Sequence, residues 1–269
     1  LDTVETIAIE SLRLGHELHD AFIQGHALLQ LAGIARLRGE STSARQYFLD
    51  CIECVKSSGA TGMHGTALSA YGRLLYEQGD YAVAHAYVTR SLMIFEEVDD
   101  TVRRSNSLRQ LGLIAMAQCD NAQAQSLLTK ALKLIRKVGN LHSLIEMLDV
   151  MGRLALRQRD YARSSALLQE SLGLAVEMNH RPRIARVLEA LACLAAAQGR
   201  MEEAARLFGA TETHAVPVET QLDPVWIADH EHWVGVARTQ LGEAAFSAAW
   251  AEGAALTLEQ ARDYAVLGE

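Results

Sequence analysis

The sequence predicts an all-α fold: a right-handed superhelical solenoid of helical hairpins with a 40-residue period and a C-terminal helical cap. Residues of one kind recur at steps of 40 along the chain. Hydrophobic residues make up 49% of the 269 positions, and only 3 positions are proline. A hairpin of two short amphipathic helices cannot bury its apolar face alone, so copies are expected to stack side by side.

Six columns of residues define the repeat over five copies. The second copy contains one residue of each column: Leu68, Tyr71, Gly72, Asp80, Ala84 and Val88. The small-residue column reads Ala32, Gly72, Gly112, Gly152 and Ala192. Small residues are needed where two helices cross closely, and large apolar residues fill the space around the crossing. A non-repetitive bundle would rarely keep six columns in register, so the repeat is the strongest signal in the chain.

These columns resemble the tetratricopeptide repeat, which places large and small residues in the same order along its two helices. The common form of that repeat has a period of about 34 residues. Here Gly72 follows Ala32 by 40 residues, which adds about a turn and a half of helix at about 3.6 residues per turn. The resemblance implies a protein-interaction module whose first helices line a concave groove.

The chain divides into three predicted parts. Residues 1–20 are expected to be the second helix of a truncated repeat, which predicts further structure upstream. Residues 21–214 hold five tetratricopeptide-like repeats, with hairpins at 22–58, 60–98, 101–138, 141–178 and 182–214. Gly, Asn or Asp separates most copies, as is typical of helix ends and left-handed backbone. The glycine-rich stretch 59–65 is interpreted as a flexible turn between repeats.

Residues 215–269 break the period and are expected to form a C-terminal helical cap, because the open end of a stack needs covering. Asp223 and Pro224 have the form of an N-cap followed by a first-turn proline. Thr257 and Gln260 have the form of a capping box that opens a last helix.

The C-terminal part carries a second resemblance. The segments that carry it are Leu-Phe-Gly-Ala at 207–210, Leu-Gly-Glu-Ala-Ala-Phe at 241–246, Ala-Trp-Ala-Glu-Gly at 249–253 and Leu-Thr-Leu-Glu-Gln-Ala at 256–261. They are similar to the end of the repeat region of large bacterial regulators, namely MalT-like signal-transduction ATPases and LuxR-type transcriptional regulators. In that family an ATPase module precedes the repeats and a helix-turn-helix module often accompanies them. Neither a Walker motif nor a basic recognition helix occurs here, so those activities would belong to other parts of a parent protein.

Composition and spacing argue against several classes of function. The net charge of −8 argues against direct contact with nucleic acid. The sequence holds no apolar run of about 18 residues that would indicate a membrane helix. Cys51 and Cys54 lack further ligands at zinc-binding spacing, and no nucleophile elbow is readable. The sequence therefore predicts a cytoplasmic protein that is not an enzyme and has no cofactor, no metal and no membrane contact.

The candidate binding site lies at inward positions on the first helices of repeats two to four. The residues are Arg73, Tyr76, Asn106, Arg109, Asp149 and Arg153. Arginine can fork onto a carboxylate or phosphate, and a tyrosine offers apolar contact. The same charges could instead pair with one another across neighbouring helices, as on any exposed helix face. The sequence leaves both interpretations open.

Function by binding follows from these observations. The chain is predicted to be the sensor or protein-interaction region of a multidomain bacterial transcriptional regulator. Its expected partner is a protein or peptide, in particular the ATPase module of the parent chain, or a small effector. The alternative is a stand-alone tetratricopeptide scaffold or peptide-pheromone receptor without an attached ATPase.

Overall fold

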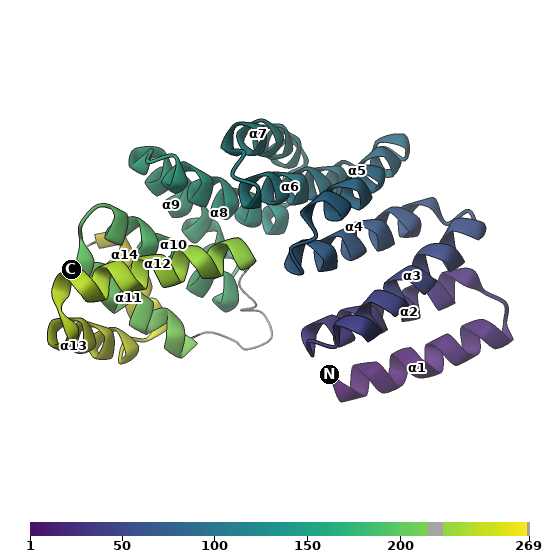
Figure 1. Ribbon diagram of the computed structural model, residues 1–269, viewed down its shortest axis with the longest axis horizontal. Helices are drawn as coiled ribbons and strands as arrows, with labels where there is room; N and C mark the ends of the chain where they lie inside the picture. Colours follow the sequence, from purple (N-terminus) through teal and green to yellow (C-terminus); the bar gives the residue numbers. More distant parts are fainter. Residues whose placement is uncertain (215–222, 268–269) are drawn as a thin grey trace. The chain divides into compact units, whose positions relative to one another are not determined.

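Every element in the described part of the chain is an α-helix. The structure is a computed structural model that describes residues 1–214 and 223–267, and it contains fourteen helices and no strand within them. In chain order (Figure 1) the helices are α1 (Asp2–Glu17), α2 (Ala21–Leu37), α3 (Ser41–Ser57), α4 (Thr61–Glu77), α5 (Tyr81–Glu97), α6 (Thr101–Ala117), α7 (Asn121–Val138), α8 (Leu141–Arg157), α9 (Tyr161–Glu177), α10 (Arg181–Ala197), α11 (Met201–His214), α12 (Pro224–Leu241), α13 (Glu243–Ala254) and α14 (Leu258–Leu267). The predicted fold class, all-α with repeated helical hairpins, is confirmed.

A new helix begins every 20 residues from α2 to α11, so two helices and their turns account for the 40-residue period. Turns at this spacing contain a residue with positive φ, including Gly59 at 75°, Asp99 at 53° and Asn179 at 49°. The next amide then bonds back to the last helical turn, for example Asp80 N to Leu75 O at 2.9 Å. The expectation of left-handed backbone between copies is therefore confirmed.

The stretch 59–65 is helical from its third residue onward, so the expectation of a flexible turn there is wrong. Helix α4 begins at Thr61 and includes Gly62 and Gly65. A Cβ atom at Gly65 would lie 2.8 Å from the ring of Phe95 on α5. Glycine is present at 65 because α5 approaches the backbone of α4 closely there.

Small residues of the repeat lie where the two helices of a hairpin cross. A Cβ atom at Gly72 would lie 2.6 Å from Val88 Cγ2. At Gly152 it would lie 2.7 Å from Leu168 Cδ2. Val88 and Leu168 are themselves fully buried. The columns seen in the sequence are thus the crossing points of the hairpins.

The helices form two compact units, residues 1–118 and residues 119–269. In the first unit each helix packs against the next, and the first helices α2, α4 and α6 also contact one another. They form an inner layer, with the second helices α3 and α5 outside it. In the second unit α8 contacts α10 in the same way, and α12, α13 and α14 pack on α10 and α11.

The start of α12 and the start of α14 have the predicted caps. Asp223 Oδ1 accepts a hydrogen bond from Val225 N at 3.2 Å. Thr257 N donates to Gln260 Oε1 at 2.9 Å, and Gln260 N donates to Thr257 Oγ1 at 3.1 Å. The predicted break in the period at 215–221 lies outside the described residues.

Candidate functional site

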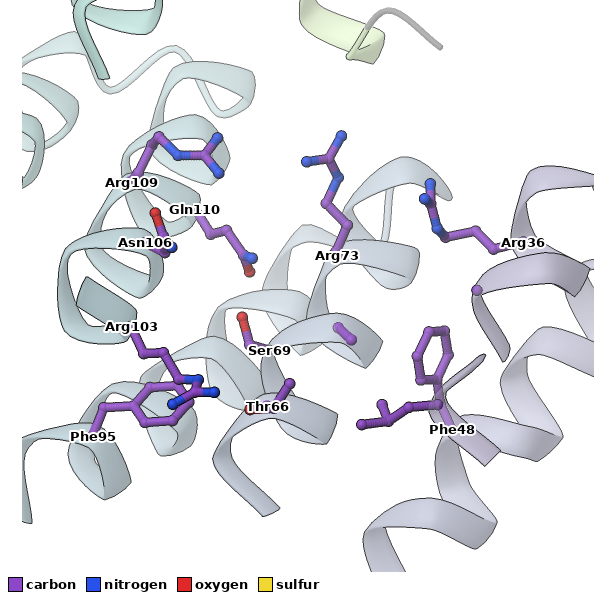
Figure 2. A pocket seen from close by; sticks show the side chains of 13 residues that line it. Arg36, Phe48, Thr66, Ser69, Arg73, Phe95, Arg103, Asn106, Arg109 and Gln110 are labelled. Carbon is purple, nitrogen blue, oxygen red and sulfur yellow. The ribbon is translucent and has the colours of Figure 1, made fainter. Parts of the chain in front are cut away.

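The inner side of α2, α4 and α6 carries an arginine-lined pocket of about 490 Å³. Its arginines come from all three helices, and Figure 2 shows their guanidinium groups around one opening: Arg36, Arg73, Arg103 and Arg109. The described lining residues include no carboxylate. Such a pocket attracts anions, and guanidinium forks suit carboxylate or phosphate groups.

Glu77, which is not among the lining residues, bonds to two of these arginines. Arg36 Nη1 donates to both carboxylate oxygens of Glu77, at 3.0 and 3.1 Å. Arg73 Nε donates to Glu77 Oε1 at 2.8 Å. The side chains of Arg36 and Arg73 remain 24% and 30% exposed. Glu77 thus holds the guanidinium groups of Arg36 and Arg73 close together at the pocket.

Helix α6 supplies the polar wall of the pocket. Arg109 is 8% exposed, and Asn106 and Gln110 lie beside it at the pocket (Figure 2). The Oδ1 atom of Asn106 and the Oε1 atom of Gln110 are buried without a hydrogen-bond partner among the described residues. These oxygens lie beneath the pocket surface, so a ligand can donate to them only after the amide side chains turn toward the pocket.

The wall is held in place at the start of α6. Arg103 Nη1 donates to Asp100 Oδ2 at 2.5 Å, and its guanidinium lies over the ring of Phe95, 5.8 Å from the centroid. Asp100 also caps α6 by accepting from Arg103 N at 2.9 Å. Burial raises the pKa of Asp100, but these bonds outweigh it, so the net pKa lies below its ordinary value.

The arginine pocket is joined to a more apolar hollow of about 530 Å³ along α2 and α4. Leu29, Thr66 and Arg103 line both. Phe22, with 61% of its surface exposed, and Met63 line only the hollow. The groove thus connects a cationic end to an apolar end, a combination that suits a peptide with acidic and apolar side chains.

Of the four predicted site residues in the first unit, the structure brings Arg73, Asn106 and Arg109 to one pocket. Tyr76 does not line it. Its side chain is 3% exposed and its ring packs 5.8 Å from that of Tyr81, so Tyr76 belongs to the core. The site prediction did not include Arg36, although Arg36 stands 40 residues before Tyr76 in the same inward column.

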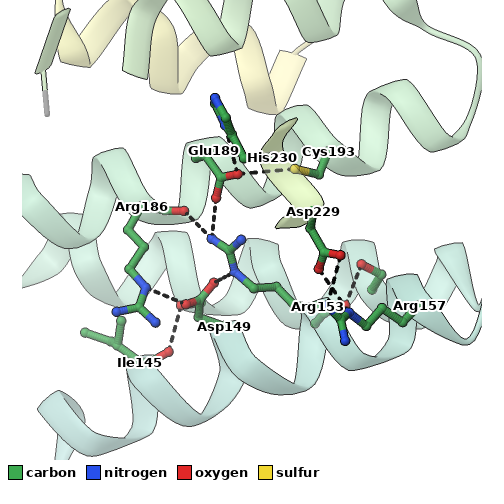
Figure 3. Close-up of polar contacts among 12 residues, drawn as sticks. Ile145, Asp149, Arg153, Arg157, Arg186, Glu189, Cys193, Asp229 and His230 are labelled. Carbon is green, nitrogen blue, oxygen red and sulfur yellow. Dashed lines mark hydrogen bonds and ion pairs between the residues drawn. The ribbon is translucent and has the colours of Figure 1, made fainter. Parts of the chain in front are cut away.

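Asp149 and Arg153 lie in the second unit, where their side chains are 3% exposed. Arg153 Nε donates to Asp149 Oδ1 at 2.9 Å, and Arg153 Nη2 lies 2.7 Å from Glu189 Oε2 (Figure 3). Arg186 Nε donates to Asp149 Oδ2 at 2.9 Å. These two residues therefore pair with charges of the neighbouring first helix, and their role in binding a ligand stays a prediction.

The charges of this buried cluster shift the ionisation of its members. Burial raises the pKa of Glu189, but Arg153 and His230 outweigh it and lower the pKa to about 2. His230 Nδ1 lies 3.4 Å from Glu189 Oε1. Cys193 Sγ donates to the same Glu189 oxygen at 3.3 Å, and burial beside that carboxylate raises the pKa of the thiol well above its usual range. Glu189 is thus held ionised while Cys193 is held protonated.

Helix α12 lies across this cluster. Arg157 Nε and Nη2 each lie 3.0 Å from a carboxylate oxygen of Asp229. The guanidinium of Arg153 lies 4.9 Å from the centroid of the Trp226 ring, a cation–π contact. Figure 3 shows α12 side chains meeting those of α8 and α10. No repeat column predicts these contacts, because α12 lies outside the repeats.

Among the described residues, no group of three or more His, Cys, Asp or Glu side chains could hold a metal ion. The buried Cys51 thiol donates to Gly25 O at 3.3 Å, and burial raises its pKa to about 12, so it is a poor nucleophile at neutral pH. None of the described helices has the length and hydrophobicity needed to span a lipid bilayer.

The stacked hairpins and their inner layer of first helices define a helical-repeat protein. A model of the tetratricopeptide repeat matches residues 24–97 and 103–177, more than half of the chain. The chain therefore belongs to the tetratricopeptide-repeat family. None of the curated proteins matches the sequence significantly.

Solved structures share the fold. BtubC from P. vanneervenii is 13% identical, with 90% of this chain and 92% of that chain covered and a TM-score of 0.61. A Rap protein complexed with Competence and Sporulation Factor is 11% identical, with 93% and 78% covered and a TM-score of 0.68. The apo form of RapI is 10% identical, with 89% and 99% covered and a TM-score of 0.59. At these identities the similarity shows the fold alone.

Proposed function

We propose that this chain is the non-catalytic sensor and protein-interaction region of a multidomain bacterial transcriptional regulator. The observation that carries the proposal is the groove on α2, α4 and α6, which joins an arginine-lined pocket to an apolar hollow. Its partner is a protein or peptide segment with acidic and apolar side chains, which the ATPase module of the parent protein or a separate effector would present.

Each part of the groove has a defined role in this proposal. Arg73 and Arg109 donate to carboxylates of the partner, and the amide groups of Asn106 and Gln110 turn toward the pocket to accept hydrogen bonds from its main chain. The apolar hollow around Phe22 takes a large aliphatic side chain. A charge-assisted hydrogen bond of this kind contributes about 1.5–3 kcal/mol.

Isothermal titration tests the proposal with two probes, the ATPase module of the parent protein and synthetic peptides that contain glutamate and leucine. We expect Arg73→Gln and Arg109→Gln each to weaken binding about tenfold or more, since each removes a charge-assisted contact. Arg90→Gln is the matched control, because Arg90 is exposed on the second helix α5. Equal affinity in all three variants, with helical content unchanged by circular dichroism, would remove this groove from consideration.

One observation favours the alternative, a stand-alone peptide receptor. The Rap protein that is similar over 93% of this chain was solved in a complex with Competence and Sporulation Factor. The two functions differ in what the gene encodes. A P-loop upstream or a helix-turn-helix downstream in the same reading frame supports the regulator, whereas a reading frame confined to these helices supports the receptor.

A further inference from the structure

In the second unit the inner face of the first helices is covered by the chain's own helix α12. Arg153 occupies on α8 the column position that Arg73 occupies on α4, 80 residues earlier. Arg73 lines an open pocket in the first unit, whereas Arg153 lies against Trp226 of α12. Helix α12 therefore occupies the place that corresponds to the open pocket of the first unit, where a ligand would bind.

The surface beneath the first half of α12, around Trp226 and Asp229, is rich in charge, whereas the second half packs on the apolar core. Arg153 and Glu189 have side chains only 3% and 6% exposed and lie 2.7 Å apart. A surface that stays covered gains more from well-packed apolar residues than from buried ion pairs. Charged residues instead keep a surface stable in water when it is uncovered. The composition of this face thus fits a surface that exists both covered and open.

The contacts of α12 with α8 and α10 also leave a hydrogen-bond donor unpaired and an ion pair partly exposed. Trp226 is fully buried, and its Nε1 atom has no hydrogen-bond partner among the described residues. The pair of Arg157 with Asp229 is about one quarter exposed, so water reaches it. A buried donor without an acceptor and an ion pair open to solvent both reduce the free energy needed to release the helix.

We propose that the inner face of α8 and α10 is a helix-binding site, that α12 is its internal occupant, and that α12 leaves to admit a partner helix. The partner carries the chemistry that α12 shows. It presents a large aromatic side chain to Arg153 and, three residues later, a carboxylate to Arg157. This site lies wholly in the second unit and does not depend on the function proposed for the groove of the first unit.

Cys193 reports whether α12 leaves. It is 1% exposed on α10 and bonds to Glu189, and Figure 3 shows it beside Asp229 and His230 of α12. The full chain is treated with a thiol reagent under native conditions, and modification of Cys193 is measured by peptide mass spectrometry. Amide exchange of α9 in the same sample measures unfolding of the whole second unit. We expect Cys193 to react faster than α9 opens.

In a second experiment, Asp229→Asn removes the negative charge that pairs with Arg157. Modification of Cys193 should become about tenfold faster or more, because a bidentate, charge-assisted pair is lost, while exchange of α9 stays unchanged. The matched control is Glu231→Gln, which removes the same charge from an exposed position on the same helix. The proposal is overturned if Cys193 in both the parent and Asp229→Asn reacts only at the rate of α9 opening.

A synthetic peptide of residues 223–241 tests the binding of a partner helix. Added to the Asp229→Asn chain, it should slow the modification of Cys193 in a saturable way. The same peptide with Asp229→Lys should not protect, because it would bring a cation against Arg157. Absence of protection by the first peptide, or equal protection by both, would overturn the helix-binding site even if α12 opens.

Discussion

Two glycines on the first helices of neighbouring repeats, Gly72 and Gly33, differ in what a side chain would meet. At Gly72 a Cβ atom would press on Val88 Cγ2 at 2.6 Å and on the carbonyl of Ala84 at 3.3 Å. At Gly33, in the first helix of the preceding repeat, nothing lies within 4 Å. Valine is stiff about χ1, so it cannot turn away cheaply. Gly72 is thus a packing requirement, whereas Gly33 only weakens its helix.

We expect Gly72→Ala to destabilise the chain by about 1–3 kcal/mol through overpacking. Gly33→Ala should leave stability unchanged or raise it by up to about 1 kcal/mol, because alanine is the better helix former. Urea unfolding followed by circular dichroism measures both changes. If Gly72→Ala raised the stability, the two helices of the hairpin could move apart at the crossing without a loss of stability.

The ionisation of Glu189 is coupled to folding, because the folded chain lowers the pKa of its carboxyl group. It faces Arg153 of α8, Cys193 of its own helix and His230 of α12. Burial opposes its charge, but the contacts with Arg153 and His230 lower its pKa from an ordinary value of 4.5 to about 2. A carboxyl whose folded pKa is depressed stabilises the fold above its unfolded pKa. That stabilisation is lost as the pH falls from about 4.5 toward 2.

Glu189→Gln should therefore destabilise the second unit at pH 7, on the order of 3 kcal/mol for a shift of this size. The difference in unfolding free energy between the variant and the parent should become smaller as the pH falls below 4.5. The reason is that the parent then loses the stabilisation that ionised Glu189 provides. Amide exchange of α8 and α10 at pH 7, 5 and 3.5 measures this. If the difference in unfolding free energy stayed constant over that pH range, Glu189 would have an ordinary pKa in the folded chain.

At the scale of elements, α11 and α13 approach each other closely at two glycines. A Cβ atom at Gly253 would lie 1.8 Å from the carbonyl oxygen of Arg206, and one at Gly209 would lie 2.2 Å from that of Trp250. Backbone atoms block both positions, so no rotamer change can make room. The segments 207–210 and 249–253 meet at this crossing, which explains physically why they contain glycine.

Gly253→Ala should cost about 3 kcal/mol or more, because the two helices must separate to admit the methyl group. Gly235→Ala on α12 is the control, since nothing lies within 4 Å of that position. It should raise stability by about 0.5–1 kcal/mol. Thermal unfolding, with amide exchange of α11 and α13, distinguishes the two. Similar melting temperatures for both variants would contradict the claim that α11 and α13 leave no room for a methyl group at Gly253.

At the scale of the whole molecule, the regular unit is the hairpin of 40 residues, not the helix of 20. Within each unit the helices alternate between two kinds of position, because neighbouring first helices contact each other whereas second helices pack outside them. A repeat protein tolerates loss of a whole unit, since each unit contacts only its neighbours. Loss of a single helix instead places every later helix in the wrong layer.

Deletion of residues 61–100, which removes α4 and α5, should leave a helical and cooperatively folding chain. It should abolish ligand binding in the groove of the first unit, because Arg73 is lost. Deletion of residues 61–80, which removes α4 alone, should prevent native folding of the first unit although it removes fewer residues. Circular dichroism and urea unfolding test both deletions. Equal folding of the two would show that the hairpin is not the unit of assembly.

The sequence by itself determined the repeated hairpins, because helix formation, turn geometry and close crossings all depend on residues near one another in the chain. The column of Gly72 and Gly152, the left-handed turns and the caps at Asp223 and Thr257 follow from such local rules. It also identified Arg73, Asn106 and Arg109 as inward-facing residues. It could not separate them from Tyr76, because a small rotation of the helix decides between the groove and the core.

Only the tertiary structure decided which inward charges are open and which are covered. Arg73 lines a pocket, whereas its column counterpart Arg153 lies beneath α12. The difference comes from contacts such as that of Arg157 with Asp229, which are 72 residues apart in the sequence. Periodicity reports which face of a helix points inward. What covers that face depends on where a distant segment folds back, and no local pattern encodes it.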